Sequence, residues 1–320
     1  MTGSEAHVVA VGVFDGVHRG HQRILARARD DARRAGVACA VVTFEPHPDA
    51  VLGKSVPRPP LTPVGEKREL LAAAGADRVE ILHFDHAMAA LAPEEFVRRR
   101  LIEGLGMVRL VAGADFALGR GRLGDVAYLR ELGARWGFSV DAVPLLLDPD
   151  GPVSSSRIRA ALAEGRVEDA ARLLGRPFRI EAQVVRGQGL GGDLGFPTAN
   201  LELLEHQAVP ADGIYAVWVT MPDGSLQPGA MYIGKRPTVG DVPHAMEVYL
   251  LDFVGELVGL PLVVDFVAWL REERRFADLA ALRAAIAEDV RQARGRLAAA
   301  PRPAAGGGGG RPPGTPEGRK

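Results

Sequence analysis

The chain has 320 residues, more than one ordinary hydrophobic core accommodates, which predicts about two domains. Hydrophobic residues make up 47% and charged residues 25%, as in a typical water-soluble protein, and the net charge of -1 argues neither for nor against nucleic-acid binding. The single cysteine, Cys39, excludes an intramolecular disulfide and suits a reducing compartment. No apolar run reaches the ~18 residues that cross a membrane, and the first residues do not resemble a signal peptide. We therefore expect a cytoplasmic protein with no membrane or nucleic-acid partner.

The first half of the chain alternates short apolar runs with amphipathic helical patterns. The apolar runs predict strands at 7–14, 37–44, 78–84, 107–113 and 138–146, and the periodic segments between them predict helices at 21–36, 65–75, 93–106 and 124–137. This alternation predicts a parallel sheet with helices on both faces, in which ligands bind beyond the carboxyl ends of the strands. Cys39 falls in a strand, so we expect a buried structural thiol.

The segment GVFDGVHRGHQ (12–22) follows the first strand and opens the first helix. The helix N-terminus offers free N–H groups and a positive dipole end, both suited to phosphate. His18 and His21 are placed to stabilise the charge of a departing pyrophosphate. The alternative is a turn with two solvent-facing histidines, which the position between strand and helix disfavours. Three glycines allow a tight turn and a close approach to the ligand: Gly12, Gly16 and Gly20.

Two later segments end strands at the same edge of the sheet. TFEPHP (43–48) carries His47 between prolines that restrict its backbone. GADFALGRGRLGD (113–125) places Asp115 and Phe116 to contact a ligand, whereas its basic run GRGR is expected to be a solvated loop.

SSSRIR (154–159) brings three hydroxyls and two guanidiniums ahead of a helical pattern. Ser154 or Ser155 can cap that helix. Arg157 and Arg159 can clamp phosphate with their forked donors. The segment alone is a weak signal. It complements the two histidines if the reaction is adenylyl transfer from ATP, because that reaction needs charge-stabilising groups on both sides of the α-phosphate.

The pattern changes after about residue 176. Short strands separated by Gly and Pro turns predict an antiparallel sheet or barrel. A closing helix follows from about Leu279, with an inner face predicted at Leu282, Ile286, Val290 and Leu297. Residues 301–320 are rich in Gly and Pro and are expected to be disordered.

GGDLGFPTANLEL (191–203) carries the candidate chemistry of the second half. Thr198 and Asn200 are two residues apart in extended chain, so both side chains point to one side, where they can hold Mg²⁺ and phosphate oxygens. The alternative is a simple turn ahead of a strand. Glu247 is an acid in an apolar strand and is either a general base or a surface carboxylate.

These motifs resemble those of the prokaryotic bifunctional riboflavin kinase/FMN adenylyltransferases, also called FAD synthetases. GVFDGVHRGHQ, VTFEPHP, GADFALGRGRLGD and SSSRIRAAL are similar to the adenylyltransferase half, and LGFPTANL, PADGIYAVWV and MEVYLLDF to the kinase half. The resemblance covers about residues 6–296 in family order. It implies a Rossmann-like nucleotidyltransferase domain at 1–174 and a six-stranded Greek-key β-barrel kinase domain with a C-terminal helix at 175–300.

The resemblance also implies roles for the candidate residues. Riboflavin, FMN and ATP would be the substrates. The resemblance leaves open whether the chain forms a homo-oligomer. His18, His21, Arg157 and Glu247 would be catalytic, Thr198 and Asn200 would hold Mg²⁺, and His47, Asp115 and Phe116 would contact flavin. The ATP and phosphate contacts would come from Gly12, Phe14, Asp15, Gly16, Gly20, Ser154, Ser155, Arg159, Gly187, Gly189 and Gly191.

One departure from the family pattern concerns the glycine-rich loop GQGLGGD (187–193), where Leu190 stands in place of an expected basic residue. This predicts a weakened kinase step. One alternative is therefore an FAD synthetase whose barrel only binds flavin or acts as a scaffold. Others are a nucleotidyltransferase acting on nicotinamide or pantetheine phosphates, which leaves the barrel unexplained, and a non-enzymatic flavin-sensing or RNA-binding protein.

Overall fold

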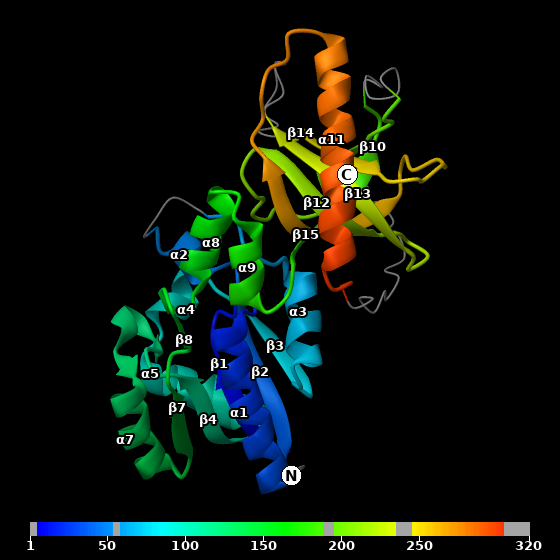
Figure 1. Cartoon of the computed structure of the whole chain (residues 1–320). Helices are drawn as coiled ribbons and strands as arrows, with labels where there is room; N and C mark the ends of the chain where they lie inside the picture. Colours follow the sequence, from blue (N-terminus) through cyan, green and yellow to red (C-terminus); the bar gives the residue numbers. More distant parts are fainter. Residues whose placement is uncertain (1–4, 54–57, 188–194, 235–244, 304–320) are drawn as a thin grey trace, which may run out of the picture. The chain divides into compact units, whose positions relative to one another are not determined.

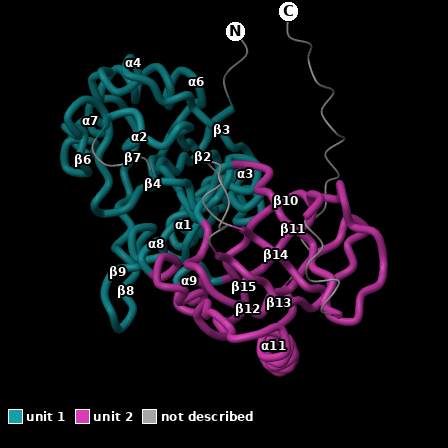
Figure 2. Tube along the Cα trace, turned by 90° about the horizontal axis from the view of Figure 1, so that it is seen from above, with its two compact units in different colours: residues 1–160, 173–175, 206–208 teal, residues 161–172, 176–205, 209–320 magenta. Residues whose placement is uncertain are grey.

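The computed structural model describes residues 5–53, 58–187, 195–234 and 245–303. The chain forms two compact units (Figures 1 and 2). The first contains Met1–Ala160, Leu173–Gly175 and His206–Ala208, and the second contains Ala161–Arg172, Arg176–Glu205 and Val209–Lys320. The tail expected to be disordered lies outside the described residues from 304 onward.

The first unit is built on a five-stranded sheet with the order β3-β2-β1-β4-β7, in which every neighbouring pair is parallel. The strands are β1 (His7–Val11), β2 (Ala38–Glu45), β3 (Arg78–His83), β4 (Met107–Gly113) and β7 (Ser139–Val143). This confirms the predicted parallel sheet. The remaining short strands pair as β5 (Ala117–Leu118) with β6 (Gly124–Asp125) and β8 (Leu147–Asp148) with β9 (Gly151–Pro152).

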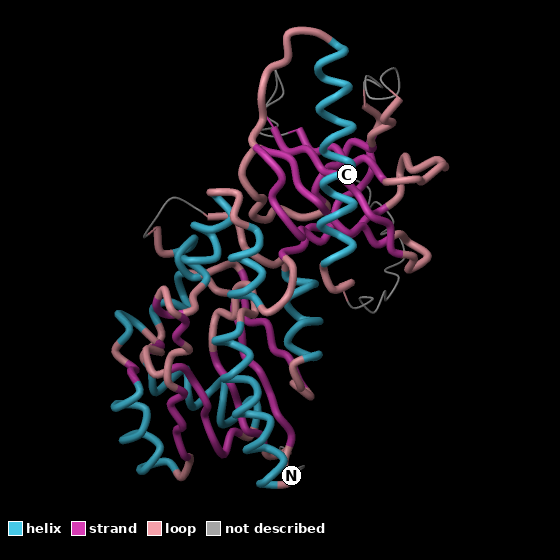
Figure 3. Tube along the Cα trace, viewed as in Figure 1, coloured by secondary structure: helices cyan, strands magenta, loops and turns pink. Residues whose placement is uncertain are grey.

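Helices cover both faces of this sheet (Figure 3). Val8 and Ala10 of β1 pack in one core cluster with residues of α1 (Arg19–Ala35) and α3 (Val64–Ala73), while Val9 and Val11 pack in the other with residues of α7 (Val126–Trp136). Because successive strand residues point to opposite faces, a strand buried on both sides reads as a continuous apolar run. Cys39 is buried in the first cluster, and burial raises the pKa of its thiol to about 11, as expected of a structural cysteine.

One predicted helix has a different form. The segment 93–106 consists of α5 (Pro93–Phe96), a π-helical stretch (Val97–Ile102) and α6 (Glu103–Leu105). Val97, Leu101 and Leu105 are buried at four-residue intervals. All three pack in the same core cluster, so this face of the segment covers the sheet. The other short helices are α2 (Pro48–Val51), α4 (His86–Ala90), the 3-10 turn Arg120–Arg122, α8 (Ser155–Ala163) and α9 (Val167–Leu174).

The second unit is a closed six-stranded barrel, as predicted, with antiparallel pairing and the order β10-β11-β14-β13-β12-β15. Its core includes Tyr215, Met231, Val248 and Phe266. The strands are β10 (Phe178–Val185), β11 (Ala199–Leu203), β12 (Gly213–Thr220), β13 (Leu226–Gly234), β14 (Ala245–Leu250) and β15 (Pro261–Arg271).

The closing helix, α11 (Leu279–Ala299), packs on the outside of the barrel through Ala293 and Leu297. Its buried positions are 285, 289, 293 and 297, so the predicted inner face is displaced by about one residue along most of the helix. Asp289 is buried on this face, and its two carboxylate oxygens accept from Nε and Nη2 of Arg271. In the part of the chain that the structure describes, no helix has the length and apolar character needed to cross a membrane.

Candidate active sites

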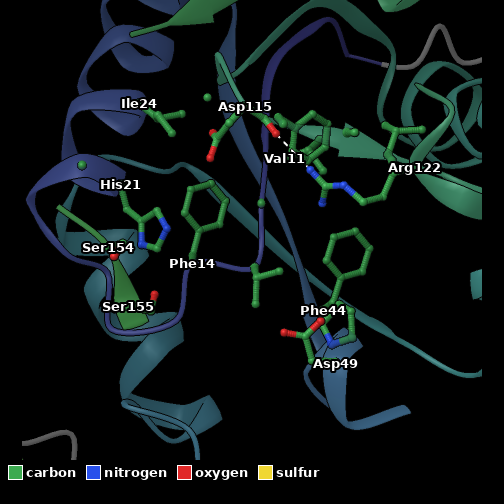
Figure 4. A pocket seen from close by; sticks show the side chains of 18 of the residues that line it. Val11, Phe14, His21, Ile24, Phe44, Asp49, Asp115, Arg122, Ser154 and Ser155 are labelled. Carbon is green, nitrogen blue, oxygen red and sulfur yellow. Dashed lines mark hydrogen bonds between the residues drawn. The ribbon is translucent and has the colours of Figure 1, made fainter. Parts of the chain in front are cut away.

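A cavity of about 820 Å³ opens at the carboxyl ends of the parallel strands, the edge that the sequence predicts (Figure 4). Its size is within the range of small-molecule sites. Its walls include Gly12, Phe14, Gly20, His18, His21, His47, Asp115, Phe116, Ser154 and Ser155, so the structure gathers these predicted residues from four separate motifs.

The loop after β1 has an unusual backbone fixed by its neighbours. Phe14 and Val17 have positive φ angles of 51° and 41°, which L residues rarely adopt, and Gly16 has a φ of 83°. Asp15 Oδ1 accepts a hydrogen bond from Leu61 N at 2.9 Å, and Gly16 N donates to Thr62 Oγ1 at 3.1 Å. Phe14 is buried against Gly12, where a Cβ atom would lie 3.1 Å from the Phe14 ring. Strain held by such contacts is common where a backbone approaches a ligand.

The two histidines lie at the N-terminus of α1 and line the cavity, so they are not simply solvent-facing. His18 is the N-cap, and its Nδ1 accepts a hydrogen bond from His21 N at 3.3 Å. Burial lowers the pKa of His21 well below its ordinary value, and the neighbouring His18 and Lys67 lower it further. The Nδ1 atom of His21 is buried and has no hydrogen-bond partner within the described residues. A neutral imidazole with an unused polar atom is ready to bind a ligand.

The serine–arginine motif packs directly on the same loop. Ser155 Oγ donates to the Asp15 carbonyl oxygen at 2.9 Å, and Ser154 Oγ caps α8 by accepting from Arg157 N at 3.4 Å. Arg159 Nη2 donates to Asp15 Oδ2 at 2.5 Å and to the Pro59 carbonyl oxygen at 3.1 Å. The predicted cap is therefore present.

Both guanidiniums of that motif bind carboxylates of the chain itself. Arg159 pairs with Asp15, and Arg157 pairs with Asp148 at 2.8 Å. Neither guanidinium is part of the cavity wall. Their interpretation from the sequence as phosphate clamps stays a prediction. The sequence does not show these carboxylate partners, since Asp15 lies 144 residues from Arg159.

Opposite the histidines, the cavity wall is aromatic. Phe44 contacts Phe84 and Phe96, with ring centroids 5.7 Å and 6.1 Å apart. His47 caps α2 through Nδ1, which accepts from Asp49 N at 3.1 Å, and burial lowers the pKa of its imidazole. Except for His47, these residues were not singled out from the sequence. The sequence feature that could have identified them is an aromatic residue at the end of each of two neighbouring strands, Phe44 in β2 and Phe84 after β3.

Arg122 was also missed. Its Nη2 donates to the Asp115 carbonyl oxygen at 3.0 Å, which brings the side chain to the cavity wall (Figure 4). The sequence predicts a solvated loop for this segment. Arg122 is indeed exposed to solvent, but it is the one arginine or lysine of the described residues that lines the cavity.

The second candidate site lies on the barrel. Thr198 Oγ1 donates to Glu247 Oε2 at 2.9 Å, and Asn200 of β11 stands opposite Glu247 of β14 in the strand register. Asn200 is buried and Glu247 half-buried. Gly187 approaches so closely that a Cβ atom there would lie 1.9 Å from Asn200 Nδ2. The three polar side chains thus form one cluster, although Gly189, Leu190 and Gly191 lie outside the described residues.

Comparison with known proteins assigns each half of the chain. The family model for FAD synthetase matches residues 2–157, and the model for riboflavin kinase matches residues 174–297. The bifunctional riboflavin kinase/FMN adenylyltransferase of Pseudomonas fluorescens is 45% identical over 289 residues, 90% of this chain and 92% of the relative. The protein of the same name from Escherichia coli strain K12 is 38% identical over 290 residues, covering 91% and 92%.

The chain belongs to the bifunctional riboflavin kinase/FMN adenylyltransferase family. The parallel sheet coincides with the FAD synthetase match, and the closed barrel with the riboflavin kinase match. A crystal structure of a Streptococcus pneumoniae protein named as a macrolide-efflux protein has the same fold, with a TM-score of 0.83 and 29% identity, and the match covers 91% of this chain and 95% of that chain.

Proposed function

We propose that this chain transfers phosphate from ATP to riboflavin, giving FMN and ADP, and then adenylyl from a second ATP to FMN, giving FAD and diphosphate. The observation that carries the proposal is the presence of two separately built polar sites, one on each family domain. The relatives named for both reactions match nine-tenths of the chain.

In the adenylyl step, the FMN phosphate attacks the α-phosphorus of ATP in line while both substrates lie in the cavity of the first unit. His18 and His21 stabilise the charge that develops on the departing diphosphate, together with the free N–H groups of α1. The strained loop 12–20 lets the backbone come close to the bound ATP. Ser154 and Ser155 lie at the same end of the cavity as His21 and are placed to bind phosphate oxygens (Figure 4). No covalent enzyme intermediate is needed.

In the kinase step, Glu247 removes the proton from the riboflavin hydroxyl that attacks the γ-phosphorus of ATP. The hydrogen bond donated by Thr198 Oγ1 to Glu247 Oε2 fixes the direction of the carboxylate.

The metal proposed for both steps is Mg²⁺. The donors available on the barrel are a hydroxyl, an amide oxygen and a carboxylate, which are the hard oxygen ligands that Mg²⁺ prefers. Thr198 and Asn200 would hold the ion together with the phosphates of ATP, where it would neutralise phosphate charge.

The boundary between the two activities is proposed to lie near residue 174. Leu174 is buried within the first unit, where it lies beside Gly16 and its carbonyl oxygen accepts from Gln22 Nε2 at 2.8 Å. We further propose a cytoplasmic enzyme whose partners are its substrates riboflavin, FMN and ATP.

The test is incubation of purified protein with riboflavin, ATP and Mg²⁺, with separation of FMN and FAD over time. FMN should appear first and FAD should follow, and both should vanish when a chelator removes the metal. Formation of FAD from supplied FMN, but no FMN from riboflavin, would instead indicate an FAD synthetase with a non-catalytic barrel. Failure of both conversions would overturn the proposal.

A further inference from the structure

Arg157 is bound on several sides by the short hairpin formed by β8 and β9. Its Nη1 donates to Asp148 Oδ1 at 2.8 Å, to the Gly151 carbonyl oxygen at 2.9 Å and to the Pro152 carbonyl oxygen at 3.0 Å. Its Nη2 donates to Asp148 Oδ2 at 3.2 Å. The Asp148 side chain is 7% exposed and that of Arg157 26%. The pair is therefore a forked, largely buried ion pair with two additional carbonyl acceptors.

The hairpin itself has little internal support. Only two residue pairs connect its strands, Leu147 with Pro152 and Asp148 with Gly151. Leu147 is 65% exposed, so the hairpin buries little apolar surface there. A two-stranded ribbon of this size is marginal without tertiary contacts. The contacts from Arg157 supply them.

The segments on both sides of the hairpin form one wall of the cavity. Pro144, Leu145 and Leu146 precede it, and Val153 to Ser156 follow it. Val153 N donates to the Leu146 carbonyl oxygen at 2.8 Å, which joins the two segments. The Val153 carbonyl oxygen lies 3.6 Å from the position of a Cβ atom on Gly20, between the two histidines. A shift of the hairpin would therefore move the wall beside the histidine loop.

The position of Arg157 explains why a guanidinium stands in the first turn of α8. A cation at a helix N-terminus opposes the helix dipole, and the Asp148 carboxylate compensates for it. For Arg157 to reach a phosphate, it would have to leave a largely buried carboxylate without this partner, which is costly.

We propose that Arg157 is a positioning residue: through Asp148 it holds the wall formed by residues 144–156, and it sets the affinity for ATP in the adenylyl step without contacting phosphate. This inference rests on the proposed function of the first unit.

The test compares Arg157→Gln, Asp148→Asn and the double variant in the full-length protein. In conversion of FMN to FAD, both single variants should raise the KM for ATP by about 10- to 100-fold, the range expected when a binding wall is misplaced. Their kcat should stay within about threefold of wild type, because His18 and His21 are intact. The double variant should be no worse than Arg157→Gln, since each change breaks the same clamp. Arg130→Gln, at an exposed position on α7, is the matched control and should be neutral.

Arg157→Lys and the riboflavin kinase step provide checks on folding. Lysine keeps the charge but not the fork, so it should restore only part of the ATP affinity, and formation of FMN should be unchanged in every variant. A direct phosphate contact predicts a different result: Arg157→Gln would lower kcat by about 10²–10³, Asp148→Asn would have little effect, and the two effects would add. That result would overturn the inference.

Amide hydrogen exchange of residues 146–153 without ATP gives a readout independent of activity. Arg157→Gln and Asp148→Asn should both accelerate exchange in the hairpin. If the wild type forms no FAD from FMN, the proposed function fails, whereas unchanged exchange in an active enzyme contradicts the clamp alone.

Discussion

The imidazole rings of His18 and His21 stack with their centroids 3.6 Å apart and an angle of 16° between their planes. Burial lowers the pKa of His21 well below its ordinary value, and a positive charge on the stacked His18 ring lowers it further. Phe14 meets the edge of His21 with centroids 5.2 Å apart, which fixes the orientation of the ring. His21 therefore lines the cavity as a neutral imidazole, the form in which we propose that it donates to phosphate.

Changing His21 to Ala should abolish FAD formation and leave FMN formation nearly intact. The variant removes the donor that we propose stabilises charge in the adenylyl step, and loss of such a donor typically costs about 10²–10³ in rate. His83→Ala, at an exposed histidine of β3, is the control and should change neither rate. The measurement is the rate of FMN formation and the rate of FAD formation, each followed by chromatography. Equal loss of both activities would contradict the assignment of two sites.

The lowered pKa of His21 predicts a pH dependence of stability. Between this lowered value and the unfolded value of about 6.5, the unfolded chain binds a proton that the folded protein does not. The stabilisation is therefore complete above about pH 6.5 and is lost as pH falls. In thermal unfolding without ATP, His21→Gln should lose less stability than wild type between pH 7 and 5.5. Parallel curves for the two proteins would show that His21 titrates normally.

Replacing Glu247 with Gln should stop riboflavin phosphorylation without unfolding the barrel. Glutamine keeps the shape and can still accept from Thr198, but it is not a base. Glu202→Gln, at an exposed carboxylate on β11, is the matched control. Circular dichroism should be unchanged for both variants. Phosphorylation at the wild-type rate in Glu247→Gln would make the residue a structural acid.

Because Leu190 stands where a basic residue is expected, we predict that the kinase step works with a raised KM for ATP. A charge-assisted hydrogen bond to phosphate is worth about 1.5–3 kcal/mol, so its absence costs on the order of 10–100-fold. Leu190→Arg should lower the KM for ATP in FMN formation only, while FAD formation from FMN stays the same. An unchanged KM would mean that the loop does not meet phosphate or that another cation already serves there.

Much of the fold could be predicted from the sequence because its patterns are local. The continuous apolar runs gave the parallel strands, and Gly36 ends α1 with a φ of 67°, as its position after the periodic segment predicts. The errors have tertiary causes. The π-helical stretch at 97–102 depends on packing, and the burial of Asp289 depends on its ion pair with Arg271, neither of which a local pattern encodes.

The candidate site was predictable where residue type and strand ends coincide. His18, His21 and Ser155 meet in one cavity because the two segments that carry them lie at the same edge of one sheet. Partners distant in the sequence were not predictable. Asp148 for Arg157 and Glu45 for the buried Lys67, whose Nζ lies 3.3 Å from Glu45 Oε2, appear only once the chain is folded.

The central claim is that one chain carries two separate sites. The most direct test is to mix the His21→Ala and Glu247→Gln proteins with riboflavin, ATP and Mg²⁺ and to measure FAD. Alone, His21→Ala should accumulate FMN, and Glu247→Gln should form FAD only when FMN is supplied. Together they should form FAD, because FMN released by the first variant is the substrate of the second. Absence of FAD from the mixture, with each variant still performing its remaining step, would contradict the account, as would FAD formed from riboflavin by Glu247→Gln alone.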